Sequence, residues 1–467
     1  MSSSQDSLWD RVRAAGPLRR RLLRDDAASV TLSDLDGASS LSEHRDRLRG
    51  RSVLIATQKQ LTAALAVIEL DGIAARLVLC PPGRSLAEIR LIALEAEANA
   101  LIVDGPGEPY DSANLGTVVQ CSPRLKPIEA QDERRQSTEW VLLTSGTTGA
   151  PKLVSHSFAS LTGDMQNPNA VGRDTTWSTF YDIRRYGGLQ ILLRALLSGG
   201  SLVMSSPDES IRDFLSRASA SGVTHITGTP SHWRRVLMSR AAQLIAPKYV
   251  RLSGEIADQP ILDGLRAVYP TAVIAHAFAS TEAGLAFDVT DGLAGFPEGL
   301  VSQHSADIEI RIENGSMLIR SSRTATRYLN RDSNSLRRED GFVETQDLVE
   351  LRKGRYYFVG RRGGIINVGG QKCHPEEIES VINQHPMVHM SLVKARRSPL
   401  LGSVVVADVV LNSGADLTPS NVTRETVSNE IMEACRRSLS AHKVPATIRI
   451  VATLEVSASG KLQRPNA

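Results

Sequence analysis

The chain has 467 residues, of which 22% are charged, 41% hydrophobic and 4% aromatic, and its formal net charge is +3. This length allows two or more domains with a sizeable core. The near balance of 54 basic and 51 acidic residues gives no reason to expect a nucleic acid or an anionic membrane as the main partner.

Targeting and redox signals point to the cytoplasm. No run of about 18 apolar residues exists that could span a membrane. The arginines between Arg11 and Arg24 are not followed by the apolar segment of a signal peptide. The cysteines lie far apart without a CxxC pair, which disfavours a disulfide framework or a metal site. They are Cys80, Cys121, Cys373 and Cys435.

Residues 53–104 alternate between short apolar runs and helical patterns. Residues 53–56, 77–80 and 100–103 are strand-like, and residues 61–75 have apolar residues at helical spacing. Alternation of this kind favours an α/β fold with a parallel sheet. The polar segment 105–137 is interpreted as a connector.

Residues 140–152 hold the chain's main motif, an apolar strand followed by a loop of small polar residues. Residues of the loop with a hydroxyl group or no side chain are Thr144, Ser145, Gly146, Thr147, Thr148 and Gly149. Their amides and hydroxyls can surround an anion, and Lys152 adds a positive charge. The glycine–lysine spacing does not fit the Walker loop. An ordinary Gly/Ser/Thr surface loop remains an alternative on composition alone.

The string Thr-Ser-Gly-Thr-Thr-Gly-x-Pro-Lys at 144–152 resembles the signature of the AMP-forming adenylating enzymes. That superfamily includes acyl- and aryl-CoA synthetases, peptide-synthetase adenylation domains and beetle luciferases. The resemblance spans about residues 30–464, with the main motifs in the family's order. It implies a large N-terminal domain of α/β subdomains, residues 1–362, which binds ATP and acid. A small mobile α+β domain, residues 363–467, is expected to follow.

Residues 178–189 fall where the resembled family lines its acyl pocket. By that resemblance we assign the substrate pocket to Arg185, Tyr186, Gly187, Gly188 and Gly254. The family commonly has a histidine just before the glycines, and this chain has Arg185 and Tyr186 there. We hypothesise that Arg184 or Arg185 recognises a second polar or anionic group on a short or aromatic acid. The alternative is that both arginines face solvent or pair with Asp182.

Two carboxylate motifs follow in the family's order. Residues 277–282 fall where the family has Tyr-Gly-x-Thr-Glu, with Phe278 in place of Tyr as the ring beside the base, Ala279 in place of Gly, and Thr281 and Glu282 retained. A carboxylate beside ATP phosphates suits Mg²⁺. Residues 345–347 match Thr-Gly-Asp with Gln346 in place of glycine, and Asp347 is expected to accept the ribose hydroxyls.

The hinge and tail motifs complete the resemblance. Arg361 matches an arginine that contacts the ribose, and Gly363 occupies the hinge position, which is usually Asp or Lys. Gly369 and Gly370 match glycines beside which pantetheine passes in CoA-forming relatives. Lys461 lies in a Ser-x-Gly-Lys sequence that matches the family's adenylation lysine.

The sequence therefore predicts an AMP-forming acid–thiol ligase. Thr144, Lys152, Glu282 and Lys461 are its expected catalytic residues. A carboxylic acid and Mg·ATP give acyl-AMP, and coenzyme A then displaces AMP. Two alternatives stay open, namely acyl transfer to a carrier-protein phosphopantetheine in trans and a degenerate nucleotide-binding protein without catalysis.

Overall fold

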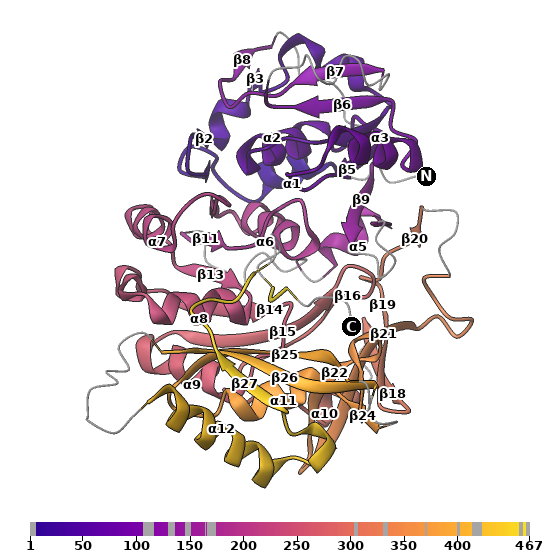
Figure 1. Ribbon diagram of the computed structural model, residues 1–467. Helices are drawn as coiled ribbons and strands as arrows, with labels where there is room; N and C mark the ends of the chain where they lie inside the picture. Colours follow the sequence, from indigo (N-terminus) through magenta and orange to yellow (C-terminus); the bar gives the residue numbers. More distant parts are fainter. Residues whose placement is uncertain are drawn as a thin grey trace.

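Figure 1 shows the computed structural model, with the amino-terminal elements at the top and the carboxyl-terminal domain at the bottom. The residues that it describes are 6–105, 116–128, 136–144, 151–163, 165, 174–302, 307–329, 335–368, 371–398, 402–412, 423–456 and 461–463. Within them, every helix is too short or too polar to cross a membrane.

The uppermost sheet contains the strands predicted from residues 53–104. Its order is β20-β10-β9-β5-β4-β6-β7. The strands are β4 (Ser52–Ile55), β5 (Arg76–Leu79), β6 (Ala100–Val103), β7 (Thr117–Gln120), β9 (Glu139–Thr144), β10 (Lys152–His156) and β20 (Arg327–Tyr328). Helices α2 (Gln60–Leu70) and α3 (Leu86–Glu95) connect β4, β5 and β6. All residues of β6 are buried, which explains its uninterrupted apolar sequence, because parallel sheets are covered on both faces.

An eight-stranded sheet forms the middle of the molecule, in the order β16-β15-β14-β13-β11-β12-β1-β2. Its strands are β1 (Leu22–Arg24), β2 (Ser29–Thr31), β11 (Thr176–Thr179), β12 (Ser201–Met204), β13 (His225–Gly228), β14 (Tyr249–Ser253), β15 (Val273–Ser280) and β16 (Gly284–Val289). The helices of this region are α1 (Leu8–Ala14), α5 (Phe158–Thr162), α6 (Tyr186–Leu197), α7 (Ile211–Ala220), α8 (Pro230–Met238) and α9 (Gln259–Val268). Strands β11, β13, β14 and β15 are parallel neighbours, so their carboxyl ends share one edge, where α/β sheets bind ligands.

A five-stranded antiparallel sheet lies below, in the order β17-β22-β21-β19-β18. Its elements are β17 (Phe296–Pro297), α10 (Gly299–Ser302), β18 (Ile308–Glu313), β19 (Ser316–Ser321), β21 (Val343–Arg352) and β22 (Arg355–Arg361). Shorter elements elsewhere are η1 (Leu32–Leu35), β3 (Ala38–Ser39), η2 (Ser42–Leu48), β8 (Lys126–Pro127) and η4 (Arg240–Leu244). One apolar cluster joins β15 and β16 to the five-stranded sheet, so the lower edge of the middle sheet is fixed to the five-stranded sheet.

The carboxyl-terminal part has a core of its own. Its elements are η5 (Arg362–Gly364), β23 (Ile366–Val368), β24 (Gln371–Cys373), α11 (Pro375–Ile382), β25 (Val388–Ser398), β26 (Gly402–Leu411), α12 (Arg424–Ser438), η6 (Ala441–Lys443) and β27 (Thr447–Ile450). Val427, Ile431 and Cys435 repeat every four residues on α12 and are fully buried in that core. The expected α/β class, with a small α+β domain after a large α/β part, is confirmed.

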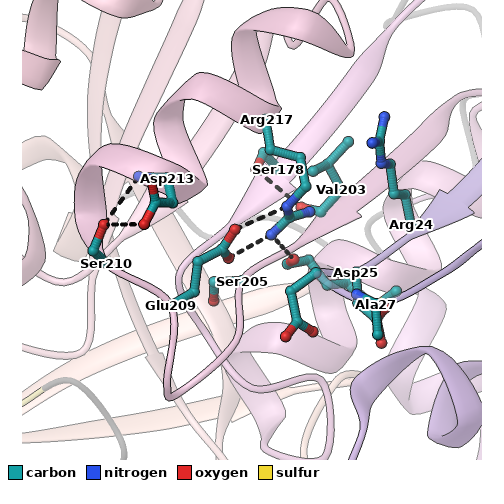
Figure 2. A network of polar contacts seen from close by, with 12 residues as sticks. Arg24, Asp25, Ala27, Ser178, Val203, Ser205, Glu209, Ser210, Asp213 and Arg217 are labelled. Carbon is teal, nitrogen blue, oxygen red and sulfur yellow. Dashed lines mark hydrogen bonds and ion pairs between the residues drawn. The ribbon is translucent and has the colours of Figure 1, made fainter.

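A buried ion pair fixes the loop that follows β12 in the middle sheet. Figure 2 shows the Arg217 guanidinium of α7 between the Glu209 carboxylate and strand β12. It donates to both Glu209 oxygens, at 2.9 and 2.5 Å, and to the Met204 carbonyl at 2.9 Å. Ser210 caps the same helix by accepting from the Asp213 amide. Arg217 therefore ties the carboxyl end of β12 to α7 and to the loop between them.

Candidate active site

The loop that carries the main motif joins two paired strands. Thr144 at the end of β9 lies opposite Lys152 at the start of β10. The predicted residues Ser145, Gly146, Thr147, Thr148 and Gly149 lie outside the described residues. The Thr144 hydroxyl is buried and has no hydrogen-bond partner among the described residues. The Lys152 ammonium lies 5.1 Å from the centre of the Tyr328 ring.

Tyr328 connects the loop to the predicted metal-binding carboxylate. Glu282 lies in the turn between β15 and β16, where its carbonyl accepts from the Ala325 amide at 2.9 Å. Burial and the hydrogen-bonded Glu282 carboxylate raise the pKa of the Tyr328 phenol. Lys152 and Glu282, far apart in sequence, therefore meet at one tyrosine.

The other residues of the 277–282 motif are held by packing and by a histidine. The Phe278 ring stacks on Phe358 at 5.3 Å with 9° between the ring planes. The Thr281 carbonyl accepts from His156 Nε2 at 2.8 Å, which ties this turn to β10. These contacts hold the 277–282 segment on the edge of the middle sheet.

Asp347 and Arg361 lie opposite each other on β21 and β22. Arg361 Nε donates to Asp347 Oδ1 at 2.9 Å, and the Asp347 amide bonds to the Thr345 hydroxyl. Gln346, where the resembled family has glycine, adopts a φ of +62°. This is a left-handed conformation that favours glycine, so the turn keeps its shape although its residue has changed.

Lys461 reaches the carboxyl end of β14 from the far end of the chain. A Cβ atom at Gly254, whose φ is +87°, would lie 3.2 Å from Lys461 Cε. The next residue donates its amide to Glu255 Oε1 at 3.0 Å. In Figure 1 the yellow tail runs from β27 toward α8 and β14. Although the residue is exposed overall, desolvation of its ammonium lowers the pKa of Lys461, and the Arg361 guanidinium adds to this shift. Arg361 thus lies within electrostatic range of both Lys461 and Glu282.

A small pocket lies between α6 and the middle sheet. Its lining residues are Tyr181, Tyr186, Gly187, Gln190, Ile191, Thr227, Arg251, Ser253, Ala279 and Leu285. Of the residues predicted for the substrate pocket, Tyr186 and Gly187 line this cavity, and their role in substrate binding stays a prediction. A Cβ at Gly188 would lie 2.2 Å from the Asp182 carbonyl, so this glycine serves the close packing of α6.

The two arginines before α6 do not line this pocket. Arg184 is fully buried and pairs with Asp182, at 2.8 Å from Nε and 2.7 Å from Nη2, and also donates to the Thr57 carbonyl. The alternative in which Arg184 pairs with Asp182 is the one observed. Arg185 is the N-cap of α6, and burial lowers its pKa.

The arginine that does line the pocket is Arg251, which the sequence interpretation missed. It lies on β14 between Val250 and Leu252, both fully buried, and is itself only 7% exposed. A charged residue inside an apolar strand was the signal that could have identified it. Tyr328 and Gln190 carried no such signal.

The hinge motif is described only in part. Gly363 lies in η5 with open space around it, between β22 and the hairpin β23–β24. Gly369 and Gly370 lie outside the described residues. The hinge and pantetheine roles stay predictions.

The comparisons with known proteins identify the family. Residues 37–317 match the AMP-binding enzyme family and residues 377–461 match the AMP-binding enzyme C-terminal domain. The chain therefore belongs to the AMP-binding enzymes, as the motifs indicated. It is 24% identical to a 2-succinylbenzoate–CoA ligase of Bacillus subtilis, over 96% of this chain and 94% of the relative.

Solved structures share the fold. An anthranilate CoA ligase in complex with anthranoyl-AMP superposes with a TM-score of 0.80 at 18% identity, covering 99% of this chain and 96% of the other. An o-succinylbenzoate CoA synthetase of Bacillus subtilis, in complex with its acyl-adenylate, gives a TM-score of 0.73 at 20% identity. It covers 98% of this chain and 97% of the other.

Proposed function

We propose that this protein is an AMP-forming ligase that activates a short carboxylic acid with ATP and passes the acyl group to coenzyme A. One observation carries the proposal: Lys461, Glu282 and the Asp347–Arg361 pair converge beside the ends of the loop between β9 and β10. Phosphoryl chemistry needs positioning and charge neutralisation more than a covalent nucleophile. This cluster offers both.

In the first step, a carboxylate oxygen of the acid attacks the α-phosphorus of ATP, the bond to pyrophosphate breaks, and acyl-AMP forms. The Lys461 ammonium neutralises charge that develops on the phosphate oxygens. Asp347, held by Arg361, accepts the ribose hydroxyls. In the second step, the thiolate of coenzyme A attacks the acyl carbon and AMP leaves.

Glu282 is the residue that would hold Mg²⁺. No group of three or more His, Cys, Asp or Glu side chains among the described residues could hold a metal ion without a ligand's help. A single carboxylate nevertheless fits Mg²⁺, which takes one or two carboxylates together with phosphate oxygens. When bound, the ion supplies charge neutralisation on the phosphates of ATP.

The alternative of a degenerate nucleotide-binding protein rested on departures such as Gln346. Gln346 keeps the left-handed turn that precedes Asp347, so the departure preserves the local backbone. Lys461 also lies beside Gly254, at the carboxyl end of β14. These two observations support catalysis.

The test is a panel of acids incubated with Mg·ATP, with pyrophosphate release and thioester formation measured separately. We expect pyrophosphate release with at least one acid and a thioester when coenzyme A is added. A thioester formed only with a holo-carrier protein would assign the acceptor to the carrier alternative. Nucleotide binding without pyrophosphate release in the presence of any acid would exclude the ligase.

A further inference from the structure

The pocket beside α6 is lined by aromatic rings and by polar side chains. Tyr181 and Tyr186 contribute the rings, and a Cβ at Gly187 would lie 3.6 Å from the Tyr181 ring. Gln190, Thr227, Arg251 and Ser253 contribute polar groups. The Thr227 hydroxyl proton is already committed, because it is donated to the Thr179 hydroxyl at 2.9 Å.

Gln190 presents an acceptor that the described protein leaves unused. Its side-chain nitrogen donates to the Leu161 carbonyl at 2.9 Å, whereas Oε1 is buried without a hydrogen-bond partner among the described residues. The opposite amide orientation would place two oxygens against each other at Leu161, so the assignment follows from the contact. The residue is 5% exposed. A buried acceptor without a donor is costly, so a ligand donor is the expected partner.

Arg251 supplies a donor to the same pocket without excess charge. Its Nη2 lies 2.7 Å from Oδ1 of Asp288, which is on β16 of the same sheet. Because this carboxylate already balances the guanidinium, a second carboxylate on the acid would bring an uncompensated negative charge into a buried site. A neutral polar group that accepts from the guanidinium fits better.

The position of Arg251 also limits the length of the acid. The reacting carboxylate must lie near Gly254, where Lys461 arrives. Arg251 lies on β14 and precedes Gly254, which directly follows the end of that strand, by three positions, a separation of about 10 Å along an extended chain. A long alkyl chain would meet the charged Arg251 guanidinium, which is 7% exposed, at that depth, whereas a substituted ring places a polar group there.

We infer that the acid is a hydroxylated aromatic acid whose hydroxyl, remote from the reacting carboxylate, donates to Gln190 Oε1 and accepts from Arg251. A hydroxyl group is the small neutral substituent that can do both at once. This inference rests on the proposed ligase function and defines the substrate class of the same pocket. Gln190 is a specificity-determining residue that contacts the substrate outside the reacting atoms.

The experiment measures kcat/KM of pyrophosphate release for the hydroxybenzoate isomers, benzoate, 2-succinylbenzoate and hexanoate. The variants are Gln190→Met and, as a matched control, Gln259→Met, because Gln259 forms comparable side-chain hydrogen bonds to Gly292 and Ala294 outside the pocket. We expect one hydroxybenzoate to exceed benzoate by about tenfold or more in the wild type. Gln190→Met should erase this preference while benzoate turnover persists, and Gln259→Met should preserve it.

The outcomes separate the two proposals. Pyrophosphate release with benzoate, hexanoate or 2-succinylbenzoate as the best acid would overturn the hydroxyl inference and leave the ligase standing. An equal loss of kcat/KM for every acid in Gln190→Met would also overturn the hydroxyl inference. A hydroxybenzoate preference that survives in this variant would overturn it as well. Absence of pyrophosphate release with all acids would overturn both proposals.

Discussion

Lys461 reaches the active site because residue 254 has no side chain. The lysine Cε lies within 3.2 Å of the place that a Cβ of residue 254 would occupy, and the backbone there is left-handed. Glu255 holds the following residue of the tail and also accepts from the Ser231 amide at 2.9 Å. One glycine and one carboxylate thus position the cation.

Replacing Lys461 by alanine should therefore abolish most acyl-AMP formation. Loss of a single preorganised charge in a transition state costs about 3–4 kcal/mol, or on the order of a hundredfold to a thousandfold in rate. Thioester formation from supplied acyl-AMP should persist, because that step does not involve pyrophosphate. The two half-reactions are measured separately, with Lys248→Ala at an exposed position as the control. Equal losses in both half-reactions would contradict the adenylation role.

Gln346 combines an unfavourable backbone conformation with an exposed side chain. Its φ of +62° costs a residue with a Cβ about 1–2 kcal/mol, which glycine does not incur. We expect Gln346→Gly to raise the free energy of unfolding by up to about 1 kcal/mol. The gain is smaller than the strain relieved, because glycine has greater entropy in the unfolded chain.

Thermal unfolding midpoints measure this effect. Gln120→Gly is the matched control, since Gln120 is exposed on β7 and has no positive φ. There the same substitution should destabilise by about 0.5–1 kcal/mol. If both variants lose stability alike, the turn before Asp347 is not strained.

At the scale of elements, Asp258 joins two helices of the large part to the carboxyl-terminal domain. It caps α9 by accepting from the Ile261 amide and pairs with Arg234 of α8 at 2.5 Å. The same carboxylate accepts from Asn383 Nδ2, just after α11, at 3.2 Å. This contact belongs to the arrangement in which Lys461 lies at Gly254.

Asn383→Asp should weaken that arrangement selectively. The new carboxylate faces Asp258 and repels it, while the retained oxygen still accepts from the Ser391 hydroxyl at 2.8 Å. We expect acyl-AMP formation to fall about tenfold, with thioester formation from supplied acyl-AMP unchanged or faster.

The matched control is Asn412→Asp, because the Asn412 side-chain amide donates to the Pro386 carbonyl within the same domain. Stopped-flow or quenched measurements of each half-reaction give the comparison. Unchanged acyl-AMP formation in Asn383→Asp would show that this contact does not hold the domain.

The elements themselves could largely be predicted from sequence, whereas their contacts could not. Apolar runs bounded by polar turns gave the parallel strands β4, β5 and β6, because burial on both faces leaves a continuous apolar pattern. Motif order placed Glu282, Asp347, Arg361 and Lys461 in one site. Gln190 and Tyr328 could not be found, since their roles depend on which helix covers the sheet and on the pairing of β20 with β10.

At the scale of the whole molecule, histidines join one element to another. His156 on β10 is fully buried and donates to the Thr281 carbonyl of the middle sheet's edge. His232 on α8 stacks on Phe180, with 5.0 Å between ring centres. Burial lowers the pKa of His156 to about 4 and that of His232 to about 3.

These lowered pKa values make the fold sensitive to acid. Below pH 6.5, which is the ordinary histidine value, the unfolded chain binds protons, whereas folded His156 stays neutral until about pH 4. Stability therefore falls as the pH decreases through this window, and it is fully retained above 6.5. For His156 the loss is on the order of 3 kcal/mol once the pH is below both values.

We expect His156→Gln, which can still donate to the Thr281 carbonyl, to show a shallower decrease of the unfolding midpoint between pH 7 and 4.5 than the wild type. Parallel curves for the two proteins would show that another group controls the acid response.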